Sequence, residues 1–402
     1  MMRKKKRPSC EVADVVQQFG DDFKATHKLP LQKLKALDAI VRCRTASLGG
    51  HKEKCDHCGH ERISYNSCRN RHCPKCQALA KERWLLNRKQ TLLPISYFHI
   101  VFTIPASLNR LALVNQRTVY NILFKASSQT LLTLAQDKRH LGAKIGFIAV
   151  LHTWGQNLMD HPHVHCIVTG GGLSQDGKRW VYPKKLTNNK DFFVHVNVIS
   201  DLFKKKFLAF LKQAYQAGLL KCVGTVKDLA DAKLFHRFVS DLYSKTWITY
   251  CKKSFGGPDN VLNYLGRYTH RVAISNHRIV NVDQQTVTFK WKDYKNHNEI
   301  KLLTLQGIEF IRRFLLHILP HGYFKIRYYG IFSNCNHKTK LEACKRLLNV
   351  TENLEDQTVL DWRDLFLQLT GIDLTICPHC GIGHMKSVGL IAPDYHAPPR
   401  LV

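Results

Sequence analysis

The segment from His161 to Gly172 constrains the fold of this chain more than any other stretch. Its first half alternates histidine with apolar or small residues, and the segment ends in three consecutive glycines. A period of two is typical of a β-strand, on which every second side chain points to the same face. His161, His163 and His165 would then lie side by side on one face of a sheet. The alternative interpretation is a half-buried strand whose histidines alternate without chemical use.

Imidazoles gathered on one strand face are suited to binding a divalent metal ion. Residues 145–154 form a second predicted strand, which a short polar loop joins to the first. If the two pair as an antiparallel hairpin, His152 lies across from His165. His161 would instead contact DNA or face solvent. The expected ligands of a catalytic divalent metal ion are therefore His163, His165 and His152, with Gln156 as the alternative to His152.

A pair of tyrosines gives these histidines a chemical use. Tyr264 and Tyr268 follow a Gly-Gly-Pro-Asp-Asn turn that would cap a helix, so they stand one turn apart on one helical face. Such a pair usually serves packing. Beside a bound metal ion, however, a tyrosine hydroxyl can attack a polarised phosphodiester and hold the broken strand as an ester. Positive side chains that would contact DNA flank the pair: Arg267, His270 and Arg271.

The charge of the chain favours nucleic acid as its partner. Among 402 residues, 61 Lys and Arg stand against 30 Asp and Glu, a formal charge of +31. A basic membrane-surface protein is the weaker alternative, because the charge is spread over the whole chain and no apolar run of membrane-spanning length occurs. The basic first residues lack the apolar stretch of a secretory signal. We therefore expect an intracellular protein whose thiols stay reduced.

The chain has 14 cysteines, and reduced cysteines in this number favour zinc as a structural cofactor. Two Cys-x-x-Cys knuckles, at 55–58 and 73–76, are separated by 14 residues. This spacing suits one zinc ion held by the thiolates of Cys55, Cys58, Cys73 and Cys76. A second set of four is Cys43, His51, Cys68 and His72, unless these are small buried side chains and solvated histidines.

Two further features accompany the cysteines. A third knuckle, Cys377 to Cys380, lacks an obvious partner, and its completion would come from Cys335, Cys344, His384 or His396. Arg69 and Arg71 lie between the first two knuckles, where the zinc ion would hold the protein backbone rigid. They would bind DNA phosphates there, and Tyr65 would stack on a base. A merely structural zinc ribbon is the alternative.

The order of predicted elements is a strand, a helix, a hairpin and then further helices. This order predicts an α+β fold with a central antiparallel sheet flanked by helices. An N-terminal helical and zinc-binding module precedes the sheet. We expect three units, at 1–94, 95–330 and 331–402, of which the last is basic and ends in a flexible tail. Besides the hairpin, the expected elements are helical residues 11–44 interrupted at Pro30, a basic helix over 78–90, a strand over 97–105, a helix over 111–136, a strand over 285–291 and a helix over 305–318.

His163-Val164-His165 resembles the histidine–hydrophobic–histidine motif of HUH endonucleases. Together with the two tyrosines and the cysteine segment, it makes the chain from about Cys43 to about Leu347 resemble the insertion-sequence-91 family of rolling-circle transposases. Further matching phrases are Cys68–Cys76, His152–Asn157 and Tyr268–Ile274.

This resemblance implies an HUH-type sheet and nicking and joining of single-stranded DNA at element ends and target, dependent on Mg²⁺ or Mn²⁺ and through a 5′-phosphotyrosyl intermediate. It also implies a bacterial cytoplasmic protein associated with the nucleoid. A zinc-dependent nucleic-acid-binding regulator without chemistry is the main alternative. A plasmid replication initiator or conjugative relaxase with the same chemistry is another.

Overall fold

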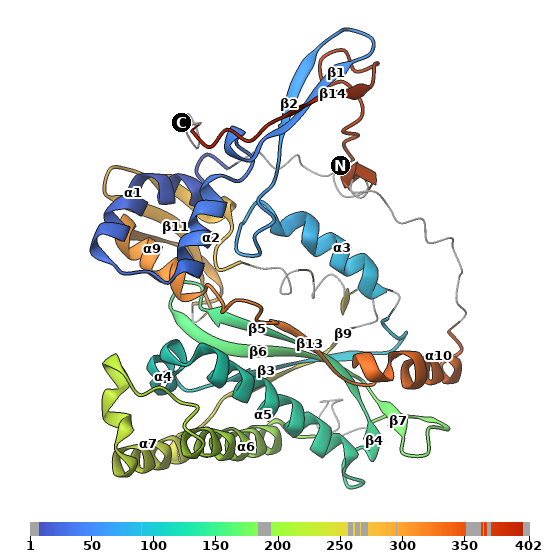
Figure 1. The fold of residues 1–402 in the computed structure, drawn as a ribbon. Helices are drawn as coiled ribbons and strands as arrows, with labels where there is room; N and C mark the ends of the chain where they lie inside the picture. Colours follow the sequence, from blue (N-terminus) through green and yellow to red (C-terminus); the bar gives the residue numbers. More distant parts are fainter. Residues whose placement is uncertain are drawn as a thin grey trace.

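A five-stranded antiparallel sheet forms the centre of the molecule (Figure 1). The computed structural model describes residues 8–89, 91–183, 194–255, 260–261, 266, 272–294, 296–350, 363–364, 366–367 and 371–396. In spatial order, the strands of this central sheet are β13 (Ile326–Gly330), β5 (Gly146–Trp154), β6 (Asp160–Thr169), β3 (Tyr97–Thr103) and β9 (Thr249–Phe255). The predicted α+β class is confirmed.

Helices cover one face of the central sheet. The even-numbered side chains of β3 and β6, such as Phe102 and Val164, are buried in one apolar core with these helices because the alternate positions of both strands are apolar. The helices that pack on this face are α4 (Asn109–Val114), α5 (Gln116–Gln136), α6 (Val196–Gln216) and α7 (Ala232–Ser244). The opposite face carries the histidines, and we call it the histidine face.

A second core joins the N-terminal helices to a later part of the chain. Helices α1 (Val12–Thr26) and α2 (Leu31–Val41) are separated by His27 to Pro30, since proline favours a helix start over a helix interior. They pack against a three-stranded sheet and α9 (Gly307–Leu316), with Phe19, Phe289 and Phe310 in the shared core. The strands of that sheet are β10 (Ile279–Val282), β11 (Thr286–Asp293) and β12 (Glu299–Gln306).

A β-ribbon projects from this N-terminal part (Figure 1). It consists of β1 (Gly50–Cys55) paired on one side with β2 (Glu61–Tyr65) and on the other with β14 (Met385–Ile391), a strand from the far end of the chain. From the base of the ribbon, α3 (Gln77–Lys89) runs to the histidine face. There Trp84 and Leu85 pack on a core that includes Val150 and Ile167 of the central sheet.

The remaining elements are small. Those with bounds inside the described residues are the strands β4 (Ala143–Lys144), β7 (Gly172–Ser174) and β8 (Trp180–Val181), the helix α10 (Glu342–Leu347), the 3-10 turns at 46–48, 106–108, 224–230, 276–278 and 334–336, and a π-helical turn at 337–341. Among the described residues, no helix is both long enough and apolar enough to cross a lipid bilayer.

Candidate active site and metal centres

Three histidines meet on the histidine face of the central sheet. His152 lies on β5, and His163 and His165 lie on β6; one ring nitrogen from each falls within 4.8 Å of the others. The rings of His152 and His165 are 4.6 Å apart, and both side chains are buried. We call these three residues the histidine cluster. Its donors converge because alternate residues of paired strands share a face.

The hairpin that carries the cluster differs from its predicted register by two residues. His152 pairs with His163, not with His165, because a tight turn over 155–159 joins the strands. A shift of two leaves every side chain on its predicted face, so His152 still reaches the cluster. Gln156, the alternative ligand, lies outside the cluster and donates from Nε2 to the Tyr294 hydroxyl at 2.9 Å.

Hydrogen bonds to the second ring nitrogen orient two of the cluster imidazoles. His163 donates from Nδ1 to the carbonyl oxygen of His161 at 2.6 Å, which leaves Nε2 as its available ligand atom. The side chain of His161 is itself exposed and outside the cluster. Nδ1 of His165 lies 2.8 Å from Nε2 of His99 on β3. Sequence reasoning missed His99, although its odd position in the strand over 97–105 placed it on the same face.

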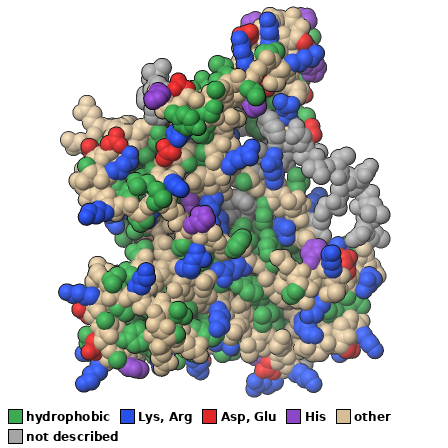
Figure 2. Space-filling model, in the orientation of Figure 1, with side chains coloured by type: hydrophobic (Ala, Val, Ile, Leu, Met, Phe, Trp, Pro, Cys, Tyr) green, Lys and Arg blue, Asp and Glu red, His purple; other side chains and the backbone are tan. Residues whose placement is uncertain are grey.

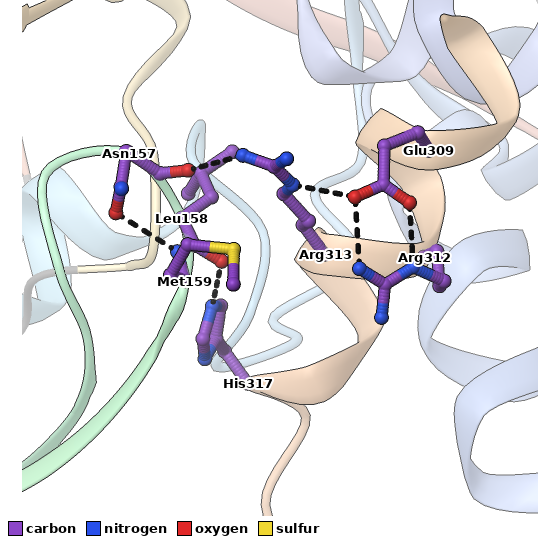
Figure 3. Close-up of polar contacts among 7 residues, drawn as sticks. All are labelled: Asn157, Leu158, Met159, Glu309, Arg312, Arg313 and His317. Carbon is purple, nitrogen blue, oxygen red and sulfur yellow. Dashed lines mark hydrogen bonds and ion pairs between the residues drawn. The ribbon is translucent and has the colours of Figure 1, made fainter. Parts of the chain in front are cut away.

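The turn between the two histidine-bearing strands is fixed by α9 (Figure 3). Arg313 donates to the carbonyl of Asn157 at 3.1 Å and is itself held by Glu309. His317, which follows α9, lies 3.0 Å from the carbonyl of Leu158 through Nε2 and 3.2 Å from the Thr153 hydroxyl through Nδ1. Burial lowers the pKa of His317 to about 4, so the imidazole that holds the turn is neutral at pH 7.

The predicted nucleophiles, Tyr264 and Tyr268, lie outside the described residues. Their basic neighbours Arg267, His270 and Arg271 lie outside them as well. Two described positions bracket Tyr264. Val261 is fully buried in the core that covers part of the histidine face. Gly266 is helical and approaches α3 so closely that an added Cβ would lie 2.9 Å from the Leu85 side chain.

Four cysteines at the base of the ribbon form the first candidate zinc centre, which we call the base cluster: Cys43, Cys68, Cys73 and Cys76. The Cys76 sulfur lies 3.5 Å from that of Cys43 and 3.6 Å from that of Cys68. Four thiolates at about 2.3 Å from a tetrahedral zinc are about 3.8 Å apart, so the geometry fits the ion. Hydrogen bonds from neighbouring thiols, first that of Cys68, lower the pKa of Cys43 to about 7.

Four more cysteines meet at the tip of the ribbon, in what we call the tip cluster: Cys55, Cys58, Cys377 and Cys380. The sulfur atoms of Cys55 and Cys380 are 3.8 Å apart, and those of Cys58 and Cys377 are 3.7 Å apart. These spacings again fit a zinc tetrathiolate.

The predicted grouping of zinc ligands is therefore wrong. Cys55 and Cys58 do not share a site with Cys73 and Cys76, because β2 lies between the two knuckles. Five residues of strand span roughly 17 Å, which puts one knuckle at the tip and the other at the base. The other predicted zinc ligands also lie outside both clusters: His51, His72, Cys335, Cys344, His384 and His396.

Arg71 and His72, two predicted site residues near the base cluster, are half-buried within the protein. The guanidinium of Arg71 donates to the carbonyl oxygens of Tyr323 at 2.5 Å and Pro320 at 2.8 Å, so these donors are engaged within the protein and not offered to phosphate. Burial lowers the pKa of His72 to about 3. Arg69, by contrast, has an exposed side chain.

Two family models of transposases match parts of this chain. Residues 15–104 match the family model described as "Transposase zinc-binding domain", and residues 146–340 match the one described as "Putative transposase". "Putative transposase y4qJ" of Sinorhizobium fredii (strain NBRC 101917 / NGR234) is 46% identical over 397 residues, which cover 98% of each chain.

"Transposase for insertion sequence element IS801" of Pseudomonas savastanoi pv. phaseolicola is 25% identical over 307 residues, which cover 75% of this chain and 70% of that protein. The matched zinc-binding segment contains the base cluster and half of the tip cluster, whereas Cys377 and Cys380 lie outside it. With one relative similar over its whole length and both family models matched, the chain belongs to the insertion-sequence-91 family of transposases.

Proposed function

We propose that this transposase nicks and joins single-stranded DNA by rolling-circle transposition, with a tyrosine as the nucleophile. The observation that carries the proposal is the histidine cluster on the histidine face of the central sheet. Val261 and Gly266 support the proposal, because they bring the chain on either side of Tyr264 to the core and helix that cover part of that face.

In the proposed reaction, the hydroxyl oxygen of Tyr264 or Tyr268 attacks the scissile phosphorus. A tyrosine–phosphorus ester bond forms and the bond from phosphorus to the 3′ oxygen breaks. The phenol proton passes to the leaving oxygen, which becomes a free 3′-hydroxyl. Attack of a 3′-hydroxyl on the ester reverses the step and joins two strands without an external energy source. The second tyrosine permits a second cleavage while the first strand is still attached.

His152, His163 and His165 would hold the catalytic metal ion. Such an ion supplies polarisation of the scissile phosphate and stabilisation of the charge that develops on it. Three imidazoles are a donor set that favours a transition metal such as Mn²⁺ over Mg²⁺, which prefers oxygen ligands. The hydrogen bonds to His161 and His99 keep His163 and His165 in fixed ring orientations.

The charge distribution supports DNA as the substrate. Lys and Arg side chains are spread over the face shown in Figure 2, on the ribbon as well as on the body. With a net charge of +31, the protein attracts phosphates over a wide surface, while the exposed Arg69 offers a guanidinium beside the base cluster. Arg267, His270 and Arg271 would contribute further contacts next to the tyrosines.

The proposal is tested by covalent adduct formation. Single-stranded oligonucleotides from the element's ends, labelled at the 5′ or the 3′ terminus, are incubated with the protein and Mn²⁺ or with a chelator. On a denaturing gel, we expect a metal-dependent adduct that retains the 3′ label and a released strand that retains the 5′ label. The double variant Tyr264→Phe/Tyr268→Phe and the variant His163→Ala should form no adduct.

Tyr243→Phe is the matched control, because this tyrosine is exposed on α7, a helix that packs on the face of the central sheet opposite the histidine cluster. It should form the adduct at the parental rate. Full nicking by the double tyrosine variant would refute the nucleophile. Tight, metal-independent binding without an adduct on any end sequence would instead favour a zinc-dependent binding protein. Nicking without transfer to a target oligonucleotide would favour a replication initiator or relaxase.

A further inference from the structure

We propose that the tip cluster is a second zinc site, split between the two ends of the chain, which fastens the C-terminal segment over 371–396 to the ribbon. Cys55 and Cys58 come from the turn after β1, and Cys377 and Cys380 come from a turn more than 300 residues later. Neither knuckle has enough thiols to close a tetrahedral site alone. The structure brings the two halves together at one point.

The two knuckles have the same local geometry. In each, a glycine follows the second cysteine in the left-handed region, Gly59 at φ 71° and Gly381 at φ 69°. The amide of each glycine donates to the carbonyl of the first cysteine of its knuckle, at 3.2 Å for Cys55 and 3.0 Å for Cys377. Two copies of one metal-binding turn therefore face each other.

Backbone amides also point at the sulfur atoms. The amide of Cys58 lies 3.4 Å from the Cys55 sulfur, and that of Gly383 lies 3.4 Å from the Cys380 sulfur. Such contacts stabilise thiolates, which are the metal-binding form of cysteine.

Close packing at Gly383 shows that the two halves are fitted to each other. An added Cβ there would lie 2.5 Å from the Cys55 sulfur and 2.5 Å from the Cβ of His57. Next to it, the amide of His384 donates to Asp56 Oδ1 at 2.8 Å, and the amide of Asp56 donates back to the His384 carbonyl at 3.0 Å. Only a residue without a side chain permits this approach.

The ribbon has almost no apolar core that could hold the C-terminal strand without an ion. In the described part of the chain, the buried apolar cluster at the tip consists of Cys55, Cys377 and Met385, with Cys380 packed against it. Most side chains of β14 are exposed, and Leu390 is 82% exposed. A narrow ribbon without a core is marginal in water, so the ion would supply the stability that packing does not.

The base cluster differs in this respect. Cys43 and Cys73 belong to the large core that α1, α2 and α9 share, so apolar packing supports that site independently of its ion. Loss of the tip ion should therefore free the C-terminal segment and leave the rest of the protein folded.

The test is the zinc content of the full chain, measured by mass spectrometry, together with hydrogen exchange of the β14 amides. We expect Cys377→Ser/Cys380→Ser and Cys55→Ser/Cys58→Ser each to lose one zinc per chain relative to the parent. Because both remove the same site, the quadruple variant should lose no more than either pair. Exchange of the amides over 385–391 should rise at least tenfold in all three, while that of β3 and β6 stays unchanged.

Two variants control this experiment. Cys222→Ser/Cys335→Ser removes two thiols outside both clusters and should keep the parental zinc content. Gly383→Val leaves all four tip thiols in place but blocks their approach, and it should lose one zinc and the protection of β14. Parental zinc content in Cys377→Ser/Cys380→Ser would overturn the proposal. A greater zinc loss in the quadruple variant than in the pairs, or undiminished β14 protection after the loss, would overturn it as well.

Discussion

Replacing His317 by glutamine should reduce the loss of unfolding free energy that the protein shows as the pH falls from 8 to 5. His317 is buried behind the turn over 155–159, between the carbonyl of Leu158 and the hydroxyl of Thr153. Burial holds its pKa at about 4 in the folded protein, against 6.5 for the unfolded chain. Glutamine keeps a donor for the Leu158 carbonyl but binds no proton in this range.

The sign follows from the direction of the pKa shift. Between pH 4 and pH 6.5 the unfolded chain holds a proton that the folded protein lacks, so the contribution of His317 is present above pH 6.5 and is lost as the pH falls through 4. At pH 5, pKa values of about 4 and 6.5 correspond to a loss of about 2 kcal/mol relative to pH 8. The variant should lose about 2 kcal/mol less between these pH values than the parent does.

The assay is urea unfolding at pH 8 and pH 5, followed by circular dichroism and analysed with a common slope. The compared quantity is the difference between the two pH values within each protein, so a general destabilisation by the substitution cancels. His236→Gln, at an exposed position on α7, is the matched control and should show the parental difference. An equal difference in the parent and in His317→Gln would refute the assignment.

Four further single substitutions have expected outcomes. Burial raises the pKa of Asp160 to about 7, so its carboxylate costs up to roughly 4 kcal/mol at pH 8, and Asp160→Asn should raise the urea midpoint there and gain less at pH 5. In Gly307→Ala the new methyl would lie 2.3 Å from the Phe19 ring, and calorimetry should show a stability loss of about 1–3 kcal/mol. Arg71→Ala should lower the free energy of unfolding by about 3 kcal/mol in thermal denaturation, because the hydrogen bonds to the carbonyls are lost. Arg69→Ala should keep the parental melting temperature but bind labelled single-stranded DNA less tightly, with a salt dependence reduced by about one phosphate contact.

The histidine face could be predicted because a strand has only two faces. The alternation around His163 fixed which side chains lie together, and an error of two residues in the register of His152 changed its partner but not its face. His99, on the neighbouring strand β3, lies on the histidine face for the same reason: alternate residues of paired strands share a face. The pattern alone did not show that β3 pairs with β6, because strand order depends on packing between elements that are distant in sequence.

The grouping of the cysteines could not be predicted from spacing alone. Fourteen intervening residues permit a shared ion if they form a loop, and forbid it if they include a strand that runs the length of a ribbon. One signal did exist in the sequence. Both knuckles of the tip cluster read Cys-x-x-Cys-Gly, at 55–59 and 377–381, whereas the knuckle ending at Cys76 is followed by glutamine. The glycine marks the shared turn geometry.

The role of Arg71 was hidden for a related reason. An arginine between metal ligands in a basic protein favours contact with phosphate, and composition carries no information about which carbonyl groups the fold will bring near it. The carbonyls of Leu319, Pro320 and Tyr323, which follow α9, all accept from the guanidinium of Arg71. The arginine thus ties the base of the ribbon to the segment that precedes β13.

Continuous contacts connect the base cluster to the histidine cluster. Cys43 and Cys73 belong to the core that includes Phe310 and Phe314 of α9. Arg313 and His317, at the end of the same helix, hold the turn between β5 and β6, and that turn sets the register of His152 against His163. Among the described residues, the small core of the tip cluster is separate from the other cores. A zinc ion at the base cluster would therefore stabilise the geometry of the histidine cluster, whereas the proposed ion at the tip cluster would act on the ribbon and the C-terminal strand.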